Sequence, residues 1–180
     1  MIHYASKIFQ FKNMQITLRN PQISDAKTMV EYMKQMLSET HYLLREPNEF
    51  LSIEEEKVYL QKLEDNPKSI FICAFDQNNM IGSVNIVSSS NRKKIAHRCS
   101  LGISVLKEYW SYGIGSKLLE EALTQANKEC YKQVELEVYA DNLRAIKLYE
   151  KYGFKQYGRL PNAFNIEETM IDSILMVKEF

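Results

Sequence analysis

The chain has 180 residues, 45% of them hydrophobic, with 23 basic and 23 acidic side chains. This length suits a domain that buries its apolar side chains without disulfide staples, and the balanced charge excludes the strongly basic classes that bind nucleic acid or an anionic membrane surface. We expect no membrane span and no signal peptide, because no apolar run approaches the roughly 20 residues of a spanning helix and residues 1–7 lack the apolar core of a signal peptide.

Hydrophobic periodicity predicts a chain that mixes strands and helices. Alternation every second residue indicates strands, and apolar residues three and four apart indicate helices. The predicted elements, in chain order, are a hairpin over 8–18 with its turn near 12–13, helices beginning at 24 and 52, strands over 70–75, 80–87 and 95–105, a helix after 113, a strand over 134–139, a helix over 142–152, and strands over 154–159 and 170–177. Strands joined by both hairpins and crossovers imply a mixed sheet in an α/β or α+β domain.

Capping signals mark three helix ends. Ser24 is expected to cap the first helix, and Ser52 the second, where Glu55 completes a capping box. Gly153 is expected to end the helix over 142–152 in the left-handed conformation. No repeat or long linker divides the chain, so we expect a single domain over 1–180, with residues 1–13 as an N-terminal extension that forms a strand of the hairpin.

The three cysteines indicate a reducing compartment. Cys73, Cys99 and Cys130 are odd in number and far apart in the sequence, and no two form a Cys-x-x-Cys pair. Two of them lie in apolar segments, so we interpret them as reduced thiols of the core. The expected location is cytoplasmic, and no metal site is expected.

A glycine turn connects the strand over 95–105 to the next helix. It contains Gly113 and Gly115, with Lys117 nearby as a cation. Successive backbone N–H groups at the start of a helix form a cradle for an anion. A dinucleotide fingerprint needs glycine where this chain has Leu118, and a Walker loop needs Gly-Lys-Ser/Thr where it has Gly-Ser-Lys. Taken alone, the turn favours a plain strand–helix connection that needs glycine for its geometry.

A second motif follows about thirty residues later and changes this interpretation. It reads N-L-R-A-I-K-L-Y-E-K-Y-G-F from Asn142 to Phe154. The two motifs together resemble the GCN5-related N-acetyltransferase (GNAT) family, in which a Gln/Arg-x-x-Gly-x-Gly/Ala turn binds the pyrophosphate of coenzyme A and an N-x-x-A-x-x-L-Y-x-x-x-G-F segment follows the next strand. The resemblance covers the chain from about Gln15 to the end and points to a bacterial branch acting on small amines or protein N-termini. Trp110 departs from the family pattern, because it stands where Gln or Arg is usual.

The resemblance implies a fold and a cosubstrate. The expected GNAT fold has a mixed central sheet of about seven strands and about four helices. Its fourth and fifth strands, here 101–105 and 134–139, are expected to splay apart. Acetyl-CoA would be the cosubstrate, with its pantetheine arm between those two strands. No metal takes part in the implied reaction.

The resemblance also implies which residues bind the cofactor. Pantetheine is expected to pair with backbone groups of Ile103 and Val105 and to contact Asn142. Because Trp110 replaces the usual polar side chain, we expect backbone amides to hold the phosphates. The residues expected around the pyrophosphate are Trp110, Gly113, Ile114, Gly115, Ser116 and Lys117.

By the same resemblance, Tyr149 lies near the sulfur and acts as the general acid for the leaving thiolate. A thiol titrates near a pKa of about 8.5 and a tyrosine near about 10, so hydrogen-bond stabilisation of the thiolate would be the larger part of this role. The helical spacing of Tyr149 by itself would indicate a core aromatic residue.

The general base is the least determined residue. Many relatives carry Glu at the position that aligns with Ser100, and serine cannot act as a base. The alternatives are Glu137, His97 or a chain of waters. His97 shares an apolar face and is expected to be packed, and Glu137 shares a strand face with Glu135 that could equally be solvated. We take Glu137 as the predicted base.

We therefore predict an enzyme that transfers acetyl from acetyl-CoA to a primary amine of a small molecule by direct attack in a ternary complex. The alternatives are a protein N-terminal or lysyl acetyltransferase and a non-catalytic acyl-CoA-binding module. Eight acidic residues over 39–65 would favour a cationic acceptor, although acidic residues also suit the first turn of a helix. We expect no nucleic acid or membrane partner. A homodimer is one candidate assembly, because dimers are common in the family, and the sequence leaves the oligomeric state open.

Overall fold

The computed structural model describes residues 1–90 and 92–180. In these residues the strands form a mixed eight-stranded sheet in the order β1-β2-β3-β4-β5-β6-β8-β7, accompanied by four α-helices. The predicted mixed α/β fold is confirmed, with one strand more than the expected seven. The elements are β1 (Lys7–Phe11), β2 (Met14–Arg19), η1 (Ile23–Asp25), α1 (Ala26–Glu39), α2 (Ile53–Glu64), β3 (Ile70–Asp76), β4 (Asn79–Ser88), β5 (Arg98–Val105), η2 (Lys107–Tyr109), α3 (Ile114–Lys128), β6 (Gln133–Tyr139), α4 (Leu143–Lys151), β7 (Lys155–Ile166) and β8 (Thr169–Glu179).

The chain divides into two compact units, which we describe separately. Unit 1 comprises residues 1–87 and 102–125, and unit 2 comprises residues 88–101 and 126–180. Strand β5 is divided between them, since its last four residues belong to unit 1 and its first four to unit 2.

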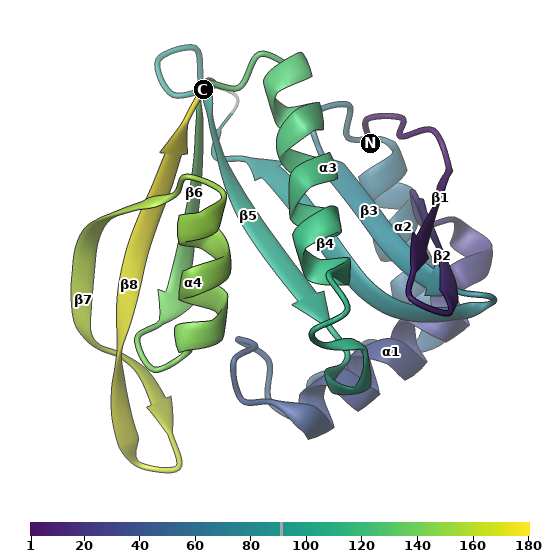
Figure 1. Cartoon of the computed structure of the whole chain (residues 1–180), viewed down its shortest axis with the longest axis horizontal. Helices are drawn as coiled ribbons and strands as arrows, with labels where there is room; N and C mark the ends of the chain where they lie inside the picture. The colour runs from purple at the N-terminus through teal and green to yellow at the C-terminus, as the bar shows by residue number, and fades with distance from the viewer. Residues whose placement is uncertain (91) are drawn as a thin grey trace. The chain divides into compact units, whose positions relative to one another are not determined.

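Unit 1 is a sheet with helices on both faces (Figure 1). Strands β1 to β4 form three consecutive antiparallel pairs in sequence order. The first six residues of β3 are buried because both faces of this part of the sheet are covered. The alternation along β5 shows which helix covers which face. Val105 and Leu118 of α3 both lie 3.1–3.2 Å from the position that a Cβ of Gly82 would take. Ser104, the residue before Val105, hydrogen-bonds Tyr32 of α1 on the opposite face.

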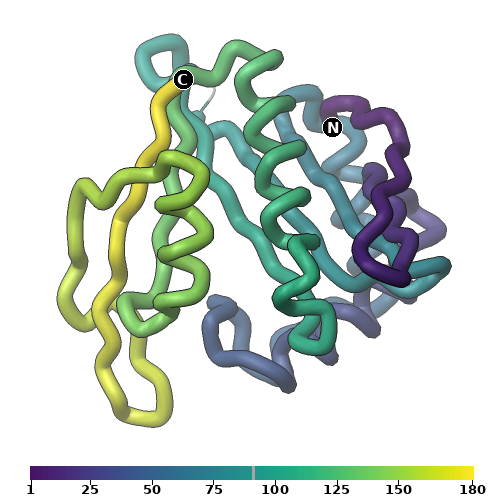
Figure 2. Tube along the Cα trace, in the orientation of Figure 1, coloured from purple at the N-terminus to yellow at the C-terminus, as the bar shows by residue number. Residues whose placement is uncertain are grey.

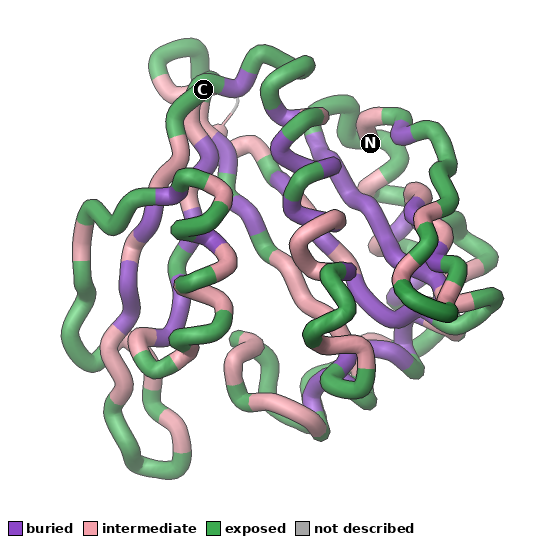
Figure 3. The backbone as a smooth tube through the Cα atoms, viewed as in Figure 1, coloured by how far each residue is buried: buried purple, intermediate pink, exposed green. Residues whose placement is uncertain are grey.

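The inner stripe of α3 is the part of this helix that the sequence predicted best. Leu118, Leu119 and Ala122 are fully buried, and Leu123 is 6% exposed. Figure 3 shows this burial as a purple band on α3 and on the strands behind it. The stripe fixes the rotation of α3 about its axis, and therefore the direction in which its first turn points.

The start of α1 differs from the prediction. Ser24 lies within the short 3-10 turn η1 and does not cap α1. Asp25 reaches back instead, and its carboxylate accepts the backbone N–H of Gln22 at 2.7 Å. Arg19 holds the same carboxylate through two hydrogen bonds of 2.6 and 2.9 Å. The ion pair therefore stabilises the short turn η1 that precedes α1, and no side chain caps α1 at Asp25. The predicted cap of α2 is confirmed, because Ser52 and Glu55 form the capping box.

Unit 2 is built on β6, β7 and β8 with α4. Strand β5 pairs with β6 in parallel over three residue pairs, from Arg98 opposite Gln133 to Ser100 opposite Glu135. Strands β6, β8 and β7 are antiparallel neighbours, and β7 and β8 form a long hairpin (Figure 2). Strand β7 extends beyond the predicted 154–159, because a register shift between Leu160 and Phe164 lets pairing resume after Pro161.

Two further predictions in unit 2 have opposite outcomes. Gly153 has φ +85° after α4, as a C-cap glycine does, and this prediction is confirmed. The prediction that His97 is packed on an apolar face is wrong. His97 is exposed in the turn before β5, where its carbonyl accepts the N–H of Lys132 at 2.9 Å. Among the described residues, no helix is long and apolar enough to cross a membrane.

Candidate functional site

The glycine turn of unit 1 has the geometry of an anion cradle. Gly113 has φ +92°, and its carbonyl accepts the N–H of Lys117 at 3.0 Å. The N–H groups of residues 114–116 lie in the first turn of α3, where an α-helix offers no internal acceptor, so they fit a phosphate group. A Cβ at Gly113 would lie 3.8 Å from the ring of Phe11, an ordinary contact. The glycine is therefore required by the left-handed conformation and not by lack of space.

Trp110 fastens this turn to the end of β5. Its indole N–H donates a hydrogen bond of 2.6 Å to the carbonyl of Val105. Of the two residues expected to pair with pantetheine, Ile103 and Val105, the second thus already has a side-chain partner on its carbonyl oxygen. Trp110, which stands where the family usually has Gln or Arg, thus makes a structural hydrogen bond within unit 1.

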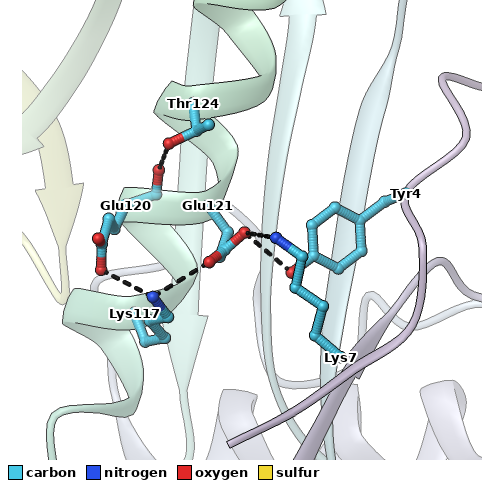
Figure 4. A network of polar contacts seen from close by, with 6 residues as sticks. All are labelled: Tyr4, Lys7, Lys117, Glu120, Glu121 and Thr124. Carbon is cyan, nitrogen blue, oxygen red and sulfur yellow. Dashed lines mark hydrogen bonds and ion pairs between the residues drawn. The ribbon is translucent and has the colours of Figure 1, made fainter.

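Lys117 is surrounded by carboxylates, which the sequence did not predict (Figure 4). Its ammonium lies 3.1 Å from Glu120 and 3.1 Å from Glu121. Glu121 is only 6% exposed, and it also accepts hydrogen bonds from Lys7 at 2.7 Å and from the hydroxyl of Tyr4 at 3.1 Å. The N-terminal segment is therefore attached to α3 one turn after the glycine cradle, and the charge of Lys117 is balanced within the protein.

The Glu121 carboxylate is stabilised in its charged form. Burial raises the pKa of Glu121, but the hydrogen bonds from Lys7, Lys117 and Tyr4 outweigh burial, and the net pKa is lowered. The unfolded chain therefore binds this proton more readily than the folded one. The resulting stabilisation is present above the unfolded pKa of about 4.3 and is lost as pH falls through the lower folded pKa.

We expect Glu121→Gln to flatten the acid side of the stability profile. The wild-type free energy of unfolding should fall more steeply than that of the variant as pH decreases from about 5 to about 3. Urea denaturation at several pH values measures both slopes. Glu120→Gln is the matched control, because Glu120 contacts the same Lys117 but its side chain is 53% exposed. Parallel slopes for the wild type and Glu121→Gln would contradict this account.

A row of hydroxyls on the α1 face of unit 1 escaped sequence analysis. Tyr32 and Ser104 are hydrogen-bonded at 2.8 Å, and Ser83 lies 3.4 Å from Ser104. Burial raises the pKa of Tyr32, which keeps its hydroxyl protonated. Tyr32 interrupts the apolar stripe of α1, and a buried tyrosine normally finds a polar partner. A tyrosine at this position of the stripe was therefore the sequence signal that could have predicted a buried polar contact. A pocket of about 200 Å³ opens beside Tyr32, with Glu31 and Glu108 in its lining.

In unit 2, the second motif forms the start and the core of α4. The side-chain oxygen of Asn142 accepts the N–H of Ala145 at 3.2 Å, so Asn142 is the N-cap of this helix. Tyr149 is 7% exposed and packs against Phe154, with ring centroids 5.7 Å apart. Burial raises the pKa of Tyr149 to about 12. The phenol is therefore a protonated hydrogen-bond donor throughout the neutral range.

The base candidates have different surroundings in unit 2. Glu135 is engaged by Arg98, whose guanidinium donates two hydrogen bonds to its two carboxylate oxygens, one of them at 2.7 Å. Glu137 and Ser100 are both exposed to solvent. Glu135 is thus a structural carboxylate, while the carboxylate of Glu137 is accessible from solvent.

Several of the eight acidic residues over 39–65 are engaged within the protein. Glu39 accepts the backbone N–H of Lys107 at 2.7 Å, and Glu54 pairs with Lys57 at 2.8 Å. Glu55 forms the capping box, and burial raises the pKa of Glu56. These contacts favour the helix-building interpretation of this segment over an acidic surface for a cationic acceptor.

Comparison with known proteins identifies a family whose match includes both sequence motifs. Residues 30–154 match the model of the Acetyltransferase (GNAT) family. The crystal structure of an acetyltransferase of the GNAT family from Streptococcus pneumoniae is 32% identical with a TM-score of 0.86, over 92% of this chain and 99% of that chain.

Two curated relatives have different acceptors in their names. N-alpha-acetyltransferase 30 of Schizosaccharomyces pombe is 29% identical over 134 residues, which are 74% of this chain and 87% of the relative. Spermidine N(1)-acetyltransferase of Vibrio cholerae is 26% identical over 155 residues, which are 86% of this chain and 87% of the relative.

Proposed function

The chain belongs to the acetyltransferase (GNAT) family and is an acetyl-CoA-dependent N-acetyltransferase, and within this class we propose that its acceptor is the primary amine of a small molecule. The cofactor half of this proposal is supported above all by the glycine turn. Its left-handed Gly113 and the first-turn amides of α3 fit the phosphates of coenzyme A.

The binding roles proposed for individual residues follow from this cradle. The amides of Gly113, Ile114, Gly115 and Ser116 would hold the pyrophosphate, as expected from the motif. Because Glu120 and Glu121 balance the charge of Lys117, we assign this lysine a supporting role in orienting the first turn of α3. The backbone of Ile103 and Val105 and the side chain of Asn142 would bind pantetheine, with Trp110 holding the Val105 end of β5.

The chemistry proposed for the chain needs a proton donor and a proton acceptor. Bound acetyl-CoA supplies the thioester whose acetyl group is transferred. Tyr149 holds on its hydroxyl the proton that a departing thiolate needs, and burial keeps that proton in place. Glu137 is the proposed base that takes a proton from the acceptor's ammonium group, directly or through water, so that the neutral amine can attack the thioester. Asn142 and Gly153 fix the two ends of the helix that carries Tyr149.

Two observations support a small amine as the acceptor. The spermidine acetyltransferase relative aligns with most of this chain. The lining of the pocket beside α1 includes the carboxylates of Glu31 and Glu108, which suit a cationic amine. The S. pombe relative supports the second candidate, acetylation of protein N-termini.

An acceptor screen tests the proposal. Release of free thiol from acetyl-CoA is measured over a panel of polyamines, other small amines, amino acids and short peptides. Turnover with small amines, and kcat/KM at least about tenfold above that of the peptides, is the expected result. Turnover confined to peptides would replace the small amine with a protein N-terminus or lysine. Acetyl-CoA binding without turnover on any acceptor would identify a non-catalytic binding module.

We expect Gly113→Ala to weaken coenzyme A binding about tenfold, which is about 1.4 kcal/mol. An alanine at φ +92° is strained by about 1–2 kcal/mol, and relief of that strain turns the first amides of α3 away from the phosphates. Titration calorimetry with coenzyme A measures the change. Gly153→Ala is the matched control, because it places the same strain at φ +85° in unit 2. Equal affinity losses in the two variants would show that strain alone, and not the cradle, controls binding.

The remaining expectations stay predictions. A cytoplasmic location rests on the three free cysteines, two of them buried. A homodimer, and the absence of nucleic acid and membrane partners, rest on the family resemblance and the balanced charge.

A further inference from the structure

The hairpin of β1 and β2 lies against the glycine cradle in unit 1. The ring of Phe9 lies beneath the ammonium of Lys117, 4.6 Å from ring centroid to nitrogen. The ring of Phe11 is the nearest group to Gly113 on the side where a Cβ would point. The ammonium of Lys12 lies 4.6 Å from the ring centroid of Tyr112, one residue before Gly113. Three contacts along one strand and its turn thus bring an N-terminal segment to the proposed phosphate site.

The two lysines beside the cradle differ in how their charge is balanced. Lys117 has two carboxylates at 3.1 Å. The contact that the described residues give to the Lys12 ammonium is an aromatic face, which attracts a cation and leaves its positive charge available to an anion. Lys12 is also exposed to solvent, so a ligand can approach it.

The backbone holds Lys12 at the tip of the hairpin. Lys12 has φ +50°, and its carbonyl accepts a hydrogen bond of 2.8 Å from the side-chain amide of Gln10. The ring of Tyr112 then directs the side chain towards the residues that precede α3. A lysine in this position supplies a point charge on a long flexible stem, which is a common way for proteins to bind phosphate.

We propose that Lys12, at the turn of the N-terminal hairpin, binds a phosphate group of coenzyme A and completes the cradle formed by the first turn of α3. This inference rests on the proposed function and adds a residue from outside both family motifs. Coenzyme A carries a pyrophosphate and a 3′-phosphate, and the ammonium of Lys12 suits either group. The N-terminal extension is therefore part of the cofactor site.

The test measures binding of coenzyme A and of 3′-dephospho-coenzyme A to the full chain by titration calorimetry. Lys12→Gln should bind coenzyme A about fivefold more weakly than the wild type, and the difference should shrink at high salt because the contact is exposed. If the 3′-phosphate is the partner, the loss disappears with the dephospho form. If the pyrophosphate is the partner, the loss is the same with both ligands. Either pattern supports the proposal.

Three variants separate binding from folding. Lys12→Arg keeps the charge and should bind within about twofold of the wild type. Lys12→Gly relieves the positive φ, so it should unfold at a temperature equal to or above that of the wild type while losing as much affinity as Lys12→Gln. Lys27→Gln, an exposed lysine on α1, is the control and should leave affinity unchanged.

Two outcomes would overturn the inference, and each is distinct from failure of the proposed function. If the wild type binds coenzyme A and Lys12→Gln binds it equally tightly, Lys12 is not part of the site. The same loss in Lys12→Gln and Lys27→Gln would reduce the effect to net charge. A wild-type chain that binds no coenzyme A would instead overturn the cofactor cradle itself.

Discussion

Replacing Tyr149 by phenylalanine is expected to lower kcat about 100-fold, within the range of a lost general acid, while the affinity for acetyl-CoA stays within about twofold of the wild type. The change removes one buried hydroxyl and keeps the ring that packs against Phe154. Steady-state kinetics with the best acceptor, together with calorimetry of cofactor binding, measure the two quantities. Tyr152→Phe, at the end of the same helix, is the matched control.

The pH dependence adds a second check on Tyr149. Burial raises the pKa of its hydroxyl to about 12, so the neutral donor form persists as pH rises from 6 to 10. A proton donor of this kind adds no descending limb to the wild-type rate profile in that interval. An unchanged kcat in Tyr149→Phe would remove Tyr149 from the mechanism and leave it as a core residue of α4.

Glu137→Gln is expected to lower kcat/KM about 100-fold at pH 7, the scale of a lost general base. A primary amine is mainly protonated at this pH and must lose a proton before it attacks. Raising the pH should restore activity in part, because more of the amine is already neutral in solution. The pH profile of kcat/KM for the variant and the wild type measures this recovery.

The control for Glu137 is Glu179→Gln, an exposed carboxylate near the end of β8 that should leave the rate unchanged. Glu135 is unsuitable as a control, because its removal would leave Arg98 without its two hydrogen bonds. A Glu137→Gln enzyme with the wild-type rate at pH 7 would move the base function elsewhere.

Sequence patterns predicted helix ends correctly where the end depends only on nearby residues. The capping box of Ser52 and Glu55 and the left-handed Gly153 were predicted because each depends on neighbours within a few residues. The prediction for Ser24 failed because Arg19, from the preceding strand, holds Asp25 in the short turn η1, and Ser24 lies inside that turn. His97 failed because the strand begins one residue after it, and alternation continued past the true boundary.

The candidate site shows the same division. The amino-acid sequence by itself determined the glycine turn, the helix over 142–152 and the stripe of that helix that carries Tyr149, because these depend on short-range spacing and on two family motifs. Tertiary structure alone decided the partners of their side chains: Glu121 with Tyr4 and Lys7, and Lys12 beside the cradle. Those contacts join residues that are far apart in the chain, and no local pattern records which charge will be balanced once the strands and α3 have packed.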